Sequence, residues 1–236
     1  MRGFIAKLGA LKSSMGGLNG MLYLADRVFD TLSGGRTRLF KYYFVQQAVH
    51  PQPLLPAHRG RKISVDELSC DDKRLSQLPR SVEVIQSRFQ QGGRCLAGFM
   101  DGAFVGCIWV NLGKYEEDEV RCDFIPCPVG EASWDYDVHV EPNYRLGFAF
   151  LRLWDETNAL LREKGIRWSI SRISAFKPES IKSHSSMGAR MVGSAAYVCV
   201  GKFQLMFSTI APFIHVSLAA RQRPVLKVGA GGSGVC

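Results

Sequence analysis

The sequence has no run of eighteen or more apolar residues, so it offers no helix long enough to span a bilayer. Its N-terminal segment lacks a compact apolar stretch followed by a cleavage site, and we therefore expect no secretory signal. Its seven cysteines are an odd number and include no CxxC pair, which disfavours a disulfide framework and a zinc site. We expect reduced thiols, no bound metal and a cytoplasmic protein.

Acidic residues are scarce at both ends of the chain. Residues 1–62 carry ten Lys or Arg against two acids, and residues 201–236 carry four against none, whereas residues 63–200 carry sixteen against nineteen. The net charge of +9 therefore lies on two basic ends. Basic ends suit a membrane surface, an acidic carrier protein or nucleic acid. Nucleic acid is the least favoured partner because no recognised binding motif accompanies the charge. The alternative is that these bases serve solubility alone.

The length of 236 residues and the ordinary composition suit one globular domain with elaborated ends. We expect an N-terminal amphipathic helical arm at 1–36, a main domain at 37–208 and a basic, partly flexible tail at 209–236. Apolar residues at steps of three or four from Phe4 to Leu32 predict the helical arm. Two hypotheses follow for residues 1–32. The arm makes a peripheral contact with the inner face of a membrane, or it packs on the domain and buries its apolar stripe.

The main domain alternates between strand-like and helix-like patterns. Its order is strand, helix, hairpin, strand, long helix, strand, short helix and two closing strands, which is an α/β pattern with too few crossovers for a doubly wound parallel sheet. The predicted strands are 38–49, 94–100, 104–112, 133–141, 168–174, 192–200 and 202–208, and the predicted helices are 79–91, 144–164 and 178–187.

A strand that ends near Pro142 runs into a turn of small residues at the predicted start of the long helix, with the sequence Tyr144-Arg145-Leu146-Gly147-Phe148-Ala149. The first turn of a helix has unpaired backbone N–H groups and the positive end of the helix dipole. Small residues there let a pyrophosphate approach the backbone, and Arg145 could add a charge-assisted contact. The alternative is an ordinary strand–turn–helix joint.

This segment resembles the central signature of the GNAT superfamily of acyl-CoA N-acyltransferases, a turn of the form [Q/R]-x-x-G-x-[G/A] that opens a long helix. Gly147 and Ala149 match, and Tyr144 stands in place of Gln or Arg. The resemblance implies a GNAT-like α/β fold whose mixed, mostly antiparallel central sheet is flanked by helices. It also implies acetyl-CoA or another acyl-CoA as co-substrate and no metal. The implied contacts to CoA come from Tyr144, Arg145, Leu146, Gly147, Phe148 and Ala149, and from the backbone of Val138 and Val140 beside the pantetheine arm.

A second resemblance covers residues 177–189, which fit the family frame N-x-x-A-x-x-x-Y-x-x-x-G-F. Ser180 stands at the small position, Gly188 at the glycine and His184 at the tyrosine. That tyrosine commonly protonates the leaving thiolate, so the resemblance implies His184 as general acid. An imidazole with an ordinary pKa near 6.5 suits the task. The alternative is a surface histidine on an amphipathic helix.

The strand at 133–141 alternates strictly, which would place Asp135, Asp137, His139 and Glu141 on one face. Asp137 and His139 are the candidates that take a proton from an attacking amine, directly or through water. A plain solvated face would show the same pattern. The string D-x-D-x-H also resembles a set of metal ligands, but acyl transfer from a thioester needs no Lewis acid.

The expected function is transfer of an acyl group, acetyl by default, from acyl-CoA to a small-molecule or lipid-like amine. Two alternatives stay open. One is a long-chain acyltransferase that uses acyl carrier protein or acyl-CoA at a membrane surface, where the basic ends would attract an acidic carrier. The other is a non-catalytic GNAT-like binding module. Loops at 64–78 and 114–132 are expected to meet the acceptor, and the acidic run 116–119 either binds its amine or is a solvated loop.

Overall fold

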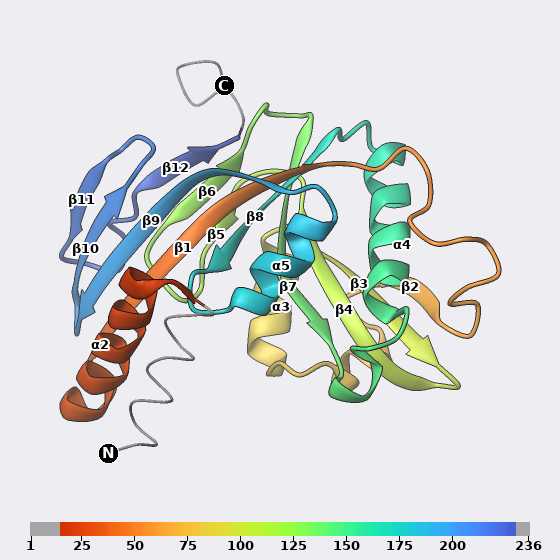
Figure 1. Cartoon of the computed structure of the whole chain (residues 1–236), viewed down its shortest axis with the longest axis horizontal. Coiled ribbons are helices and arrows are strands. Elements are labelled where there is room, and N and C mark those ends of the chain that lie inside the picture. Colours follow the sequence, from red (N-terminus) through yellow and green to blue (C-terminus); the bar gives the residue numbers. More distant parts are fainter. Residues whose placement is uncertain (1–14, 230–236) are drawn as a thin grey trace. The chain divides into compact units, whose positions relative to one another are not determined.

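The structure, a computed structural model, describes residues 15–229 of the 236-residue chain. These residues form two compact units. Unit 1 comprises 15–47, 116–125 and 171–229, and unit 2 comprises 48–115 and 126–170 (Figure 1). Both units mix helices with mostly antiparallel strands, so the α/β class predicted from the sequence is confirmed.

Unit 2 contains four antiparallel strands in the order β7-β4-β3-β2. The predicted hairpin at Asp101-Gly102 is confirmed, since both residues adopt positive φ between β3 and β4. Two α-helices and two short 3₁₀ helices complete the unit. The elements are β2 (Ser64–Leu68), η1 (Lys73–Gln77), α3 (Val82–Gln90), β3 (Arg94–Met100), β4 (Ala103–Asn111), β7 (Ala132–Val140), η2 (Pro142–Tyr144) and α4 (Ala149–Glu163).

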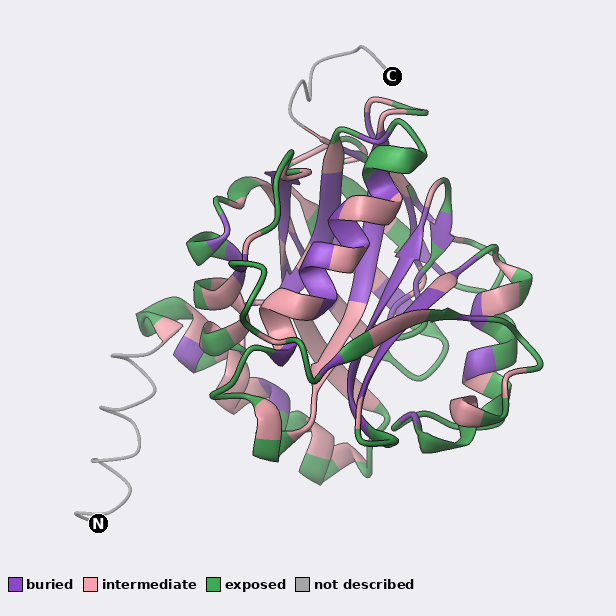
Figure 2. Ribbon diagram, turned by 90° about the vertical axis from the view of Figure 1, so that its right-hand side faces the viewer, coloured by how far each residue is buried: buried purple, intermediate pink, exposed green. Residues whose placement is uncertain are grey.

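Helix α4 packs against β3 and β4 through one face. Leu153, Trp154 and Leu161 lie on that face at helical spacing, and each is fully buried. Figure 2 colours the whole ribbon by burial, with buried, intermediate and exposed stretches distinguished. Burying one such side chain stabilises a fold by about 1.5–3 kcal/mol. The start of α4 is thereby held firmly beside the end of β7, where the sequence predicts the CoA site.

Strands β4 and β7 approach each other unusually closely at Gly106. A Cβ atom at this position would lie 2.4 Å from the carbonyl oxygen of His139 and 3.1 Å from Leu153 Cδ1. Any other residue type would therefore push β7 away from β4. Beside this contact, the pairing register shifts between Cys107 and Trp109.

The register shift is a β-bulge in β7 at Asp137, whose φ is 50°. Tyr136 is paired with Trp109 and His139 with Cys107, so Tyr136 and His139 lie on the same face of the sheet. The predicted strict alternation, which put them on opposite faces, is wrong. It fails because hydrophobic patterning does not reveal an extra residue in one strand.

Unit 1 contains four antiparallel strands in the order β11-β10-β9-β1. A small sheet with the order β12-β6-β5 lies mainly in this unit, and β8 starts in unit 2 and ends in unit 1. The elements are α2 (Gly17–Ser33), β1 (Thr37–Ala48), β5 (Tyr115–Glu116), β6 (Asp123–Pro126), β8 (Trp168–Ser174), α5 (Pro178–Ser186), β9 (Arg190–Val200), β10 (Phe203–Ser208), β11 (Ile214–Ser217) and β12 (Val225–Val228).

Two of these strands, β11 and β12, lie in the segment that the sequence predicts to be a partly flexible tail. Leu226 and Val228 of β12 are buried, so this part of the segment is folded.

The expectation that all cysteines are reduced is wrong for one residue, because Cys127 is disulfide-bonded. Free thiols are found at Cys70, Cys95, Cys107, Cys122 and Cys199.

Helix α2 occupies the second half of the predicted N-terminal arm, and residues 1–14 lie outside the described part of the chain. It is fixed to β1 by polar contacts, since buried Asp26 accepts hydrogen bonds from Arg38 Nε (3.0 Å) and from the backbone N–H of Leu39 (2.8 Å). Leu18 and Leu32 are 60% and 80% exposed, so the hypothesis that docking buries the apolar stripe is wrong for these residues. Among residues 15–229 no helix is long and apolar enough to cross a membrane.

Two residues of the acidic run 116–119, Glu117 and Glu119, belong to an ion-pair network of unit 1. Both oxygens of buried Glu117 accept hydrogen bonds from Arg172, at 2.6 and 2.7 Å, and Arg172 also pairs with Glu119 at 2.8 Å. The guanidinium lies 4.4 Å from the ring centroid of Tyr42. Burial raises the pKa of Glu117, and the Arg172 charge opposes that rise. Glu117 is therefore neither a solvated residue nor free to bind an amine.

Breaking this pair should destabilise the protein strongly. We expect Arg172→Met to lower the free energy of unfolding by about 3 kcal/mol, because it leaves the carboxylate of Glu117 buried without its counter-ion. Arg167→Met is the matched control, since Arg167 pairs with Glu131 at an exposed site and its loss should cost less than about 1 kcal/mol. Urea unfolding of both variants measures the difference. Equal losses would show that the Glu117–Arg172 pair does not stabilise the fold.

Candidate functional site

The segment that leads from β1 to β2 runs along α4 and is attached to it. Asp155 of α4 accepts hydrogen bonds from the backbone N–H groups of Leu54 (2.5 Å) and Leu55 (3.3 Å), and Arg162 donates to the carbonyl oxygen of His50. Asp155 is buried, so these bonds are shielded from water. They bring the following residues, 58–62, to the N-terminal end of α4.

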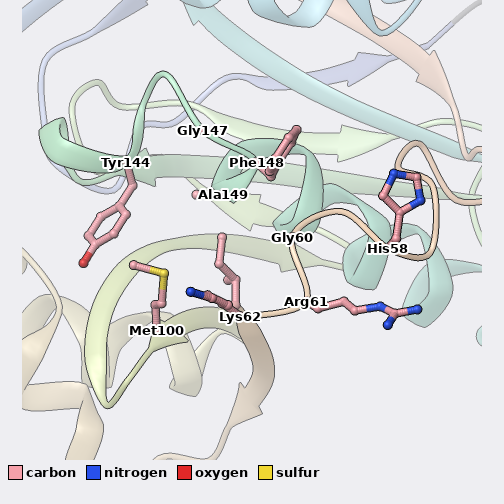
Figure 3. Close-up of a pocket in the computed structure, with 10 residues that line it drawn as sticks. His58, Gly60, Arg61, Lys62, Met100, Tyr144, Gly147, Phe148 and Ala149 are labelled. Atoms are coloured by element: carbon pink, nitrogen blue, oxygen red, sulfur yellow. The ribbon is translucent and has the colours of Figure 1, made fainter.

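A pocket of about 450 Å³ lies where this segment meets the turn before α4 (Figure 3). Its volume falls in the range of small-ligand sites. The segment contributes basic side chains, the turn contributes its small residues, and β3 contributes the apolar end of its strand. The lining residues are His58, Gly60, Arg61, Lys62, Ile63, Met100, Tyr144, Gly147, Phe148 and Ala149.

The helix end at this pocket has no side-chain cap. Helix α4 begins at Ala149, five residues later than predicted, and its N-cap Phe148 makes no capping hydrogen bond. The first turn also has no acidic residue. Its backbone N–H groups and the positive end of the dipole are therefore available to an anion. The N–H of Gly147 is an exception, because it donates to the carbonyl oxygen of Tyr144 at 3.1 Å.

Positive charge surrounds this helix end. The Arg59 guanidinium lies 5.6 Å from the ring centroid of Phe148, and Arg61 and Lys62 line the pocket with exposed side chains. In Figure 3 the side chains of Lys62, Met100 and Tyr144 lie around one side of the pocket, and Arg61 and His58 lie toward the other. A ligand with anionic and apolar parts fits this lining.

The structure separates the predicted cofactor residues into two groups. Tyr144, Gly147, Phe148 and Ala149 line the pocket, whereas Arg145 and Leu146 do not. Arg145 Nε donates to the carbonyl oxygen of Val140 at 3.0 Å, and Leu146 is fully exposed. Val140 packs beside Ile63, Val105 and Ala149, and Val138 follows the bulge residue.

Asp137, one of the two predicted bases, lies between two arginines. It pairs with Arg80, and its Oδ2 lies 2.5 Å from Arg88 Nη1. Arg88 is buried, with its guanidinium 5.3 Å from the ring of Trp109 and 5.2 Å from that of Tyr136. Burial lowers the pKa of Arg88, but the Asp137 carboxylate outweighs it and the net pKa is raised. Asp137 is thus the counter-ion of a buried charge.

His139, the other predicted base, is part of a carboxylate–imidazole pair. Its Nε2 lies 3.0 Å from Glu141 Oε1, and its ring stacks on Phe104 with an interplanar angle of 10°. The side chain is 23% exposed, so water or a substrate can reach it. A carboxylate partner holds the ring in one orientation. Within residues 15–229 no group of three or more His, Cys, Asp or Glu side chains is placed to hold a metal ion.

His184, the predicted acid, belongs to α5 of unit 1, whereas the other predicted residues belong to unit 2. It is 6% exposed, so it is not a surface histidine. Burial lowers its pKa to about 4, and the ring is therefore neutral at pH 7. The premise of an ordinary pKa near 6.5 is wrong, because the sequence does not report burial.

The basic segment 58–62 is not among the site residues expected from the sequence. Its residues His-Arg-Gly-Arg-Lys hold four basic side chains in five positions. That density is a usable signal, although it also forms part of the basic N-terminal end. Only the hydrogen bonds to Asp155 reveal that the segment reaches the start of α4.

The fold has counterparts among solved structures, while no family profile and no curated protein sequence matches the chain. A conserved protein of unknown function from Staphylococcus epidermidis ATCC 12228 aligns with 75% of this chain and 67% of its own, at a TM-score of 0.50 and 8% identity. An aminoglycoside acetyltransferase from an uncultured soil metagenomic sample aligns with 54% of this chain and 88% of its own, at a TM-score of 0.41 and 14% identity. A tandem GNAT protein from the clavulanic acid biosynthesis pathway aligns with 70% of this chain and 55% of its own, at a TM-score of 0.42 and 14% identity.

The chain therefore shares its fold with the Staphylococcus epidermidis protein over the aligned part, and its mixed, mostly antiparallel sheet is the kind that the resemblance in its sequence predicted. At identities of 8–14% the likeness concerns the fold alone. The two likenesses with TM-scores below 0.5 carry no argument about substrate or mechanism.

The buried neutral His184 should make stability depend on pH. Below pH 6.5 the unfolded imidazole binds a proton that the folded imidazole, with a pKa of about 4, does not bind. Stability is thus fully present above pH 6.5 and falls as the pH approaches 4, by about 3 kcal/mol. Urea unfolding between pH 7.5 and 4 should show a steeper loss for wild type than for His184→Gln. Parallel curves for the two proteins would contradict a buried, neutral His184.

Proposed function

We propose that this protein is an acyl-CoA-dependent N-acyltransferase that moves an acyl group, acetyl by default, to an amine. The carrying observation is the basic pocket at the uncapped start of α4. The resemblance of residues 144–149 and 177–189 to the GNAT signature supports acyl transfer as the class of reaction. Acyl-CoA acts as co-substrate and is consumed in each turnover.

The nucleotide end of CoA has the chemistry that this pocket suits. It combines phosphate groups with an adenine ring, and the pocket combines Arg61 and Lys62 with the apolar surface of Met100 and Phe148. The free N–H groups of the first turn of α4 add hydrogen-bond donors for a phosphate. Arg61 and Lys62 thus supply the positive charge that Tyr144 does not supply at the family's Gln or Arg position.

The reaction requires one proton to leave the amine and one to reach the sulfur. The amine nitrogen attacks the thioester carbonyl carbon, the C–N bond forms, the C–S bond breaks, and the thiolate leaves. His139 is the better of the two candidate bases, because Glu141 orients its ring and its side chain is accessible. Asp137 is the weaker candidate, since Arg80 and Arg88 occupy its carboxylate.

The resemblance in the sequence implies His184 as the general acid. With a pKa of about 4 its ring is neutral at pH 7, so it is not an imidazolium that gives its proton to the thiolate. The proton that the base removes from the amine reaches the thiolate through water. The acceptor is a small-molecule or lipid-like amine.

A second donor is compatible with the same pocket. Exposed Arg59, Arg61 and Lys62 stand at its rim, and acyl carrier proteins are acidic. The phosphopantetheine arm of a carrier would then replace CoA, and the same bases would bind the carrier surface. Binding of a donor without turnover would instead identify a non-catalytic module.

The first test concerns donor binding. We expect the double variant Arg61→Glu, Lys62→Glu to weaken acetyl-CoA binding roughly 10–100-fold, because it removes charge-assisted contacts to phosphate. Gly147→Val should also weaken it by filling the approach to the helix end. The fold should tolerate Gly147→Val, since a Cβ there meets only the carbonyl oxygen of Tyr144 at 3.4 Å. Calorimetry with acetyl-CoA, longer acyl-CoAs and an acyl carrier protein measures each affinity.

Lys73→Glu is the matched control, because Lys73 is an exposed base of unit 2 that does not line the pocket. It should bind acetyl-CoA as wild type does. Equal weakening by Lys73→Glu would show that only net charge matters. Wild-type protein that binds neither a CoA species nor a carrier protein would refute the enzyme proposal.

The second test concerns catalysis, measured as thiol release with a panel of amines. His139→Gln should lower turnover roughly 10²–10⁴-fold, the usual effect of removing a general base. The variant should leave donor affinity nearly unchanged. Full turnover in His139→Gln would exclude it as the base.

A further inference from the structure

The outer face of the sheet in unit 1 is apolar across three strands. Residues that are paired between neighbouring strands present their side chains on the same face of a sheet. Val200 pairs with Phe203, and Leu205 pairs with both Val198 and Val216. Phe207 likewise pairs with both Ala196 and Ile214. These pairs make one surface, which we call the β9–β11 face. Its members are Ala196, Val198, Val200, Phe203, Leu205, Phe207, Ile214 and Val216.

This face is open to solvent, whereas the opposite face is packed. Phe207 is 47% exposed and Ile214 63%, while Tyr197 and Met206 of the opposite face are at most 1% exposed. The loops at the two ends of β11 add Phe213 and Leu218, 63% and 64% exposed. A contiguous exposed apolar surface of this kind marks an interaction site.

From residue 180 to the end of the sequence, the Lys, Arg, Asp and Glu side chains are all basic. Glu179 is the last acidic residue of the sequence, and six bases follow it. Lys202 and Arg221 are exposed in the turns that adjoin the face. Arg36 lies at the same end as Lys202, because its carbonyl oxygen accepts a hydrogen bond from Gly201 at 2.8 Å. Arg223 differs, since it pairs with Asp123.

We propose that the β9–β11 face binds an anionic lipid surface, with its aromatic and aliphatic side chains in the interface and Arg36, Lys202 and Arg221 against the headgroups. Apolar side chains beside exposed bases are the combination that peripheral membrane contact requires. A second copy of the chain would instead bring two rims of the same charge together. Charge complementarity therefore favours the lipid surface.

This surface differs from the one that the sequence suggested. Membrane contact was expected through residues 1–32, and α2 does expose Leu18, Phe29 and Leu32. The β9–β11 face belongs to strands far along the chain and carries its own bases. No residue of this face lines the pocket of the proposed acyl transfer, so the two proposals are tested separately.

Vesicle co-sedimentation tests the proposal on the full chain. Wild-type protein should pellet with vesicles of phosphatidylcholine and phosphatidylglycerol at low salt, and it should be released at 0.5 M salt. Phe207→Ser with Ile214→Ser should reduce the bound fraction at least tenfold. Lys202→Glu with Arg221→Glu should do the same.

Matched controls come from unit 2. Val82→Ser removes an apolar side chain that is 61% exposed, and Lys73→Glu reverses an exposed base. Both should bind vesicles as wild type does, and melting curves should show that all variants are folded. The proposal would be overturned if wild-type protein stayed in the supernatant at low salt, or if it bound equally well to vesicles of pure phosphatidylcholine. A dimer in sedimentation velocity that is lost in Phe207→Ser with Ile214→Ser would assign the face to a second copy instead.

Discussion

The buried guanidinium of Arg88 needs a carboxylate beside it, because an unpaired charge between Trp109 and Tyr136 would cost several kcal/mol. Asp137 supplies that carboxylate from within β7, and it does so at the bulge where its own φ is positive. The bulge then sets the direction of the strand beyond it. His139 consequently shares a face with Tyr136, so the bulge that carries this ion pair fixes where the better candidate base lies.

The pocket likewise depends on a buried charged residue, in this case Asp155 of α4. Asp155 is buried on α4 and has two oxygens to satisfy, and two consecutive backbone N–H groups of the β1–β2 segment satisfy them. The cost of leaving a buried carboxylate without partners makes this attachment strong. The basic residues 58–62 follow from it, since they come only a few positions later. The pocket at the start of α4 is thereby completed by residues from a distant part of the sequence.

In unit 1, buried charged groups also need partners, and they find them among one another. Glu117, Arg172 and Tyr42 satisfy one another inside the unit, and Asp123 takes up Arg223. Glu117 and Asp123 are thus used internally, whereas Glu119 and Glu179 are exposed. The open apolar face of β9, β10 and β11 lies beside the exposed bases Lys202 and Arg221.

The sequence alone determined the α/β class, most element positions and the turn before α4. Hydrophobic periodicity and turn residues act over a few neighbours, so they can be read locally: the Asp101-Gly102 hairpin and the strand at 133–141 are examples. Tertiary structure alone decided the bulge at Asp137, the burial of His184 and the contact of residues 58–62 with α4. Burial, counter-ions and close approaches such as that at Gly106 arise between residues far apart in the chain, and a pKa follows from them. A residue's type is therefore written in the sequence, but its protonation state and its neighbours are set by the fold.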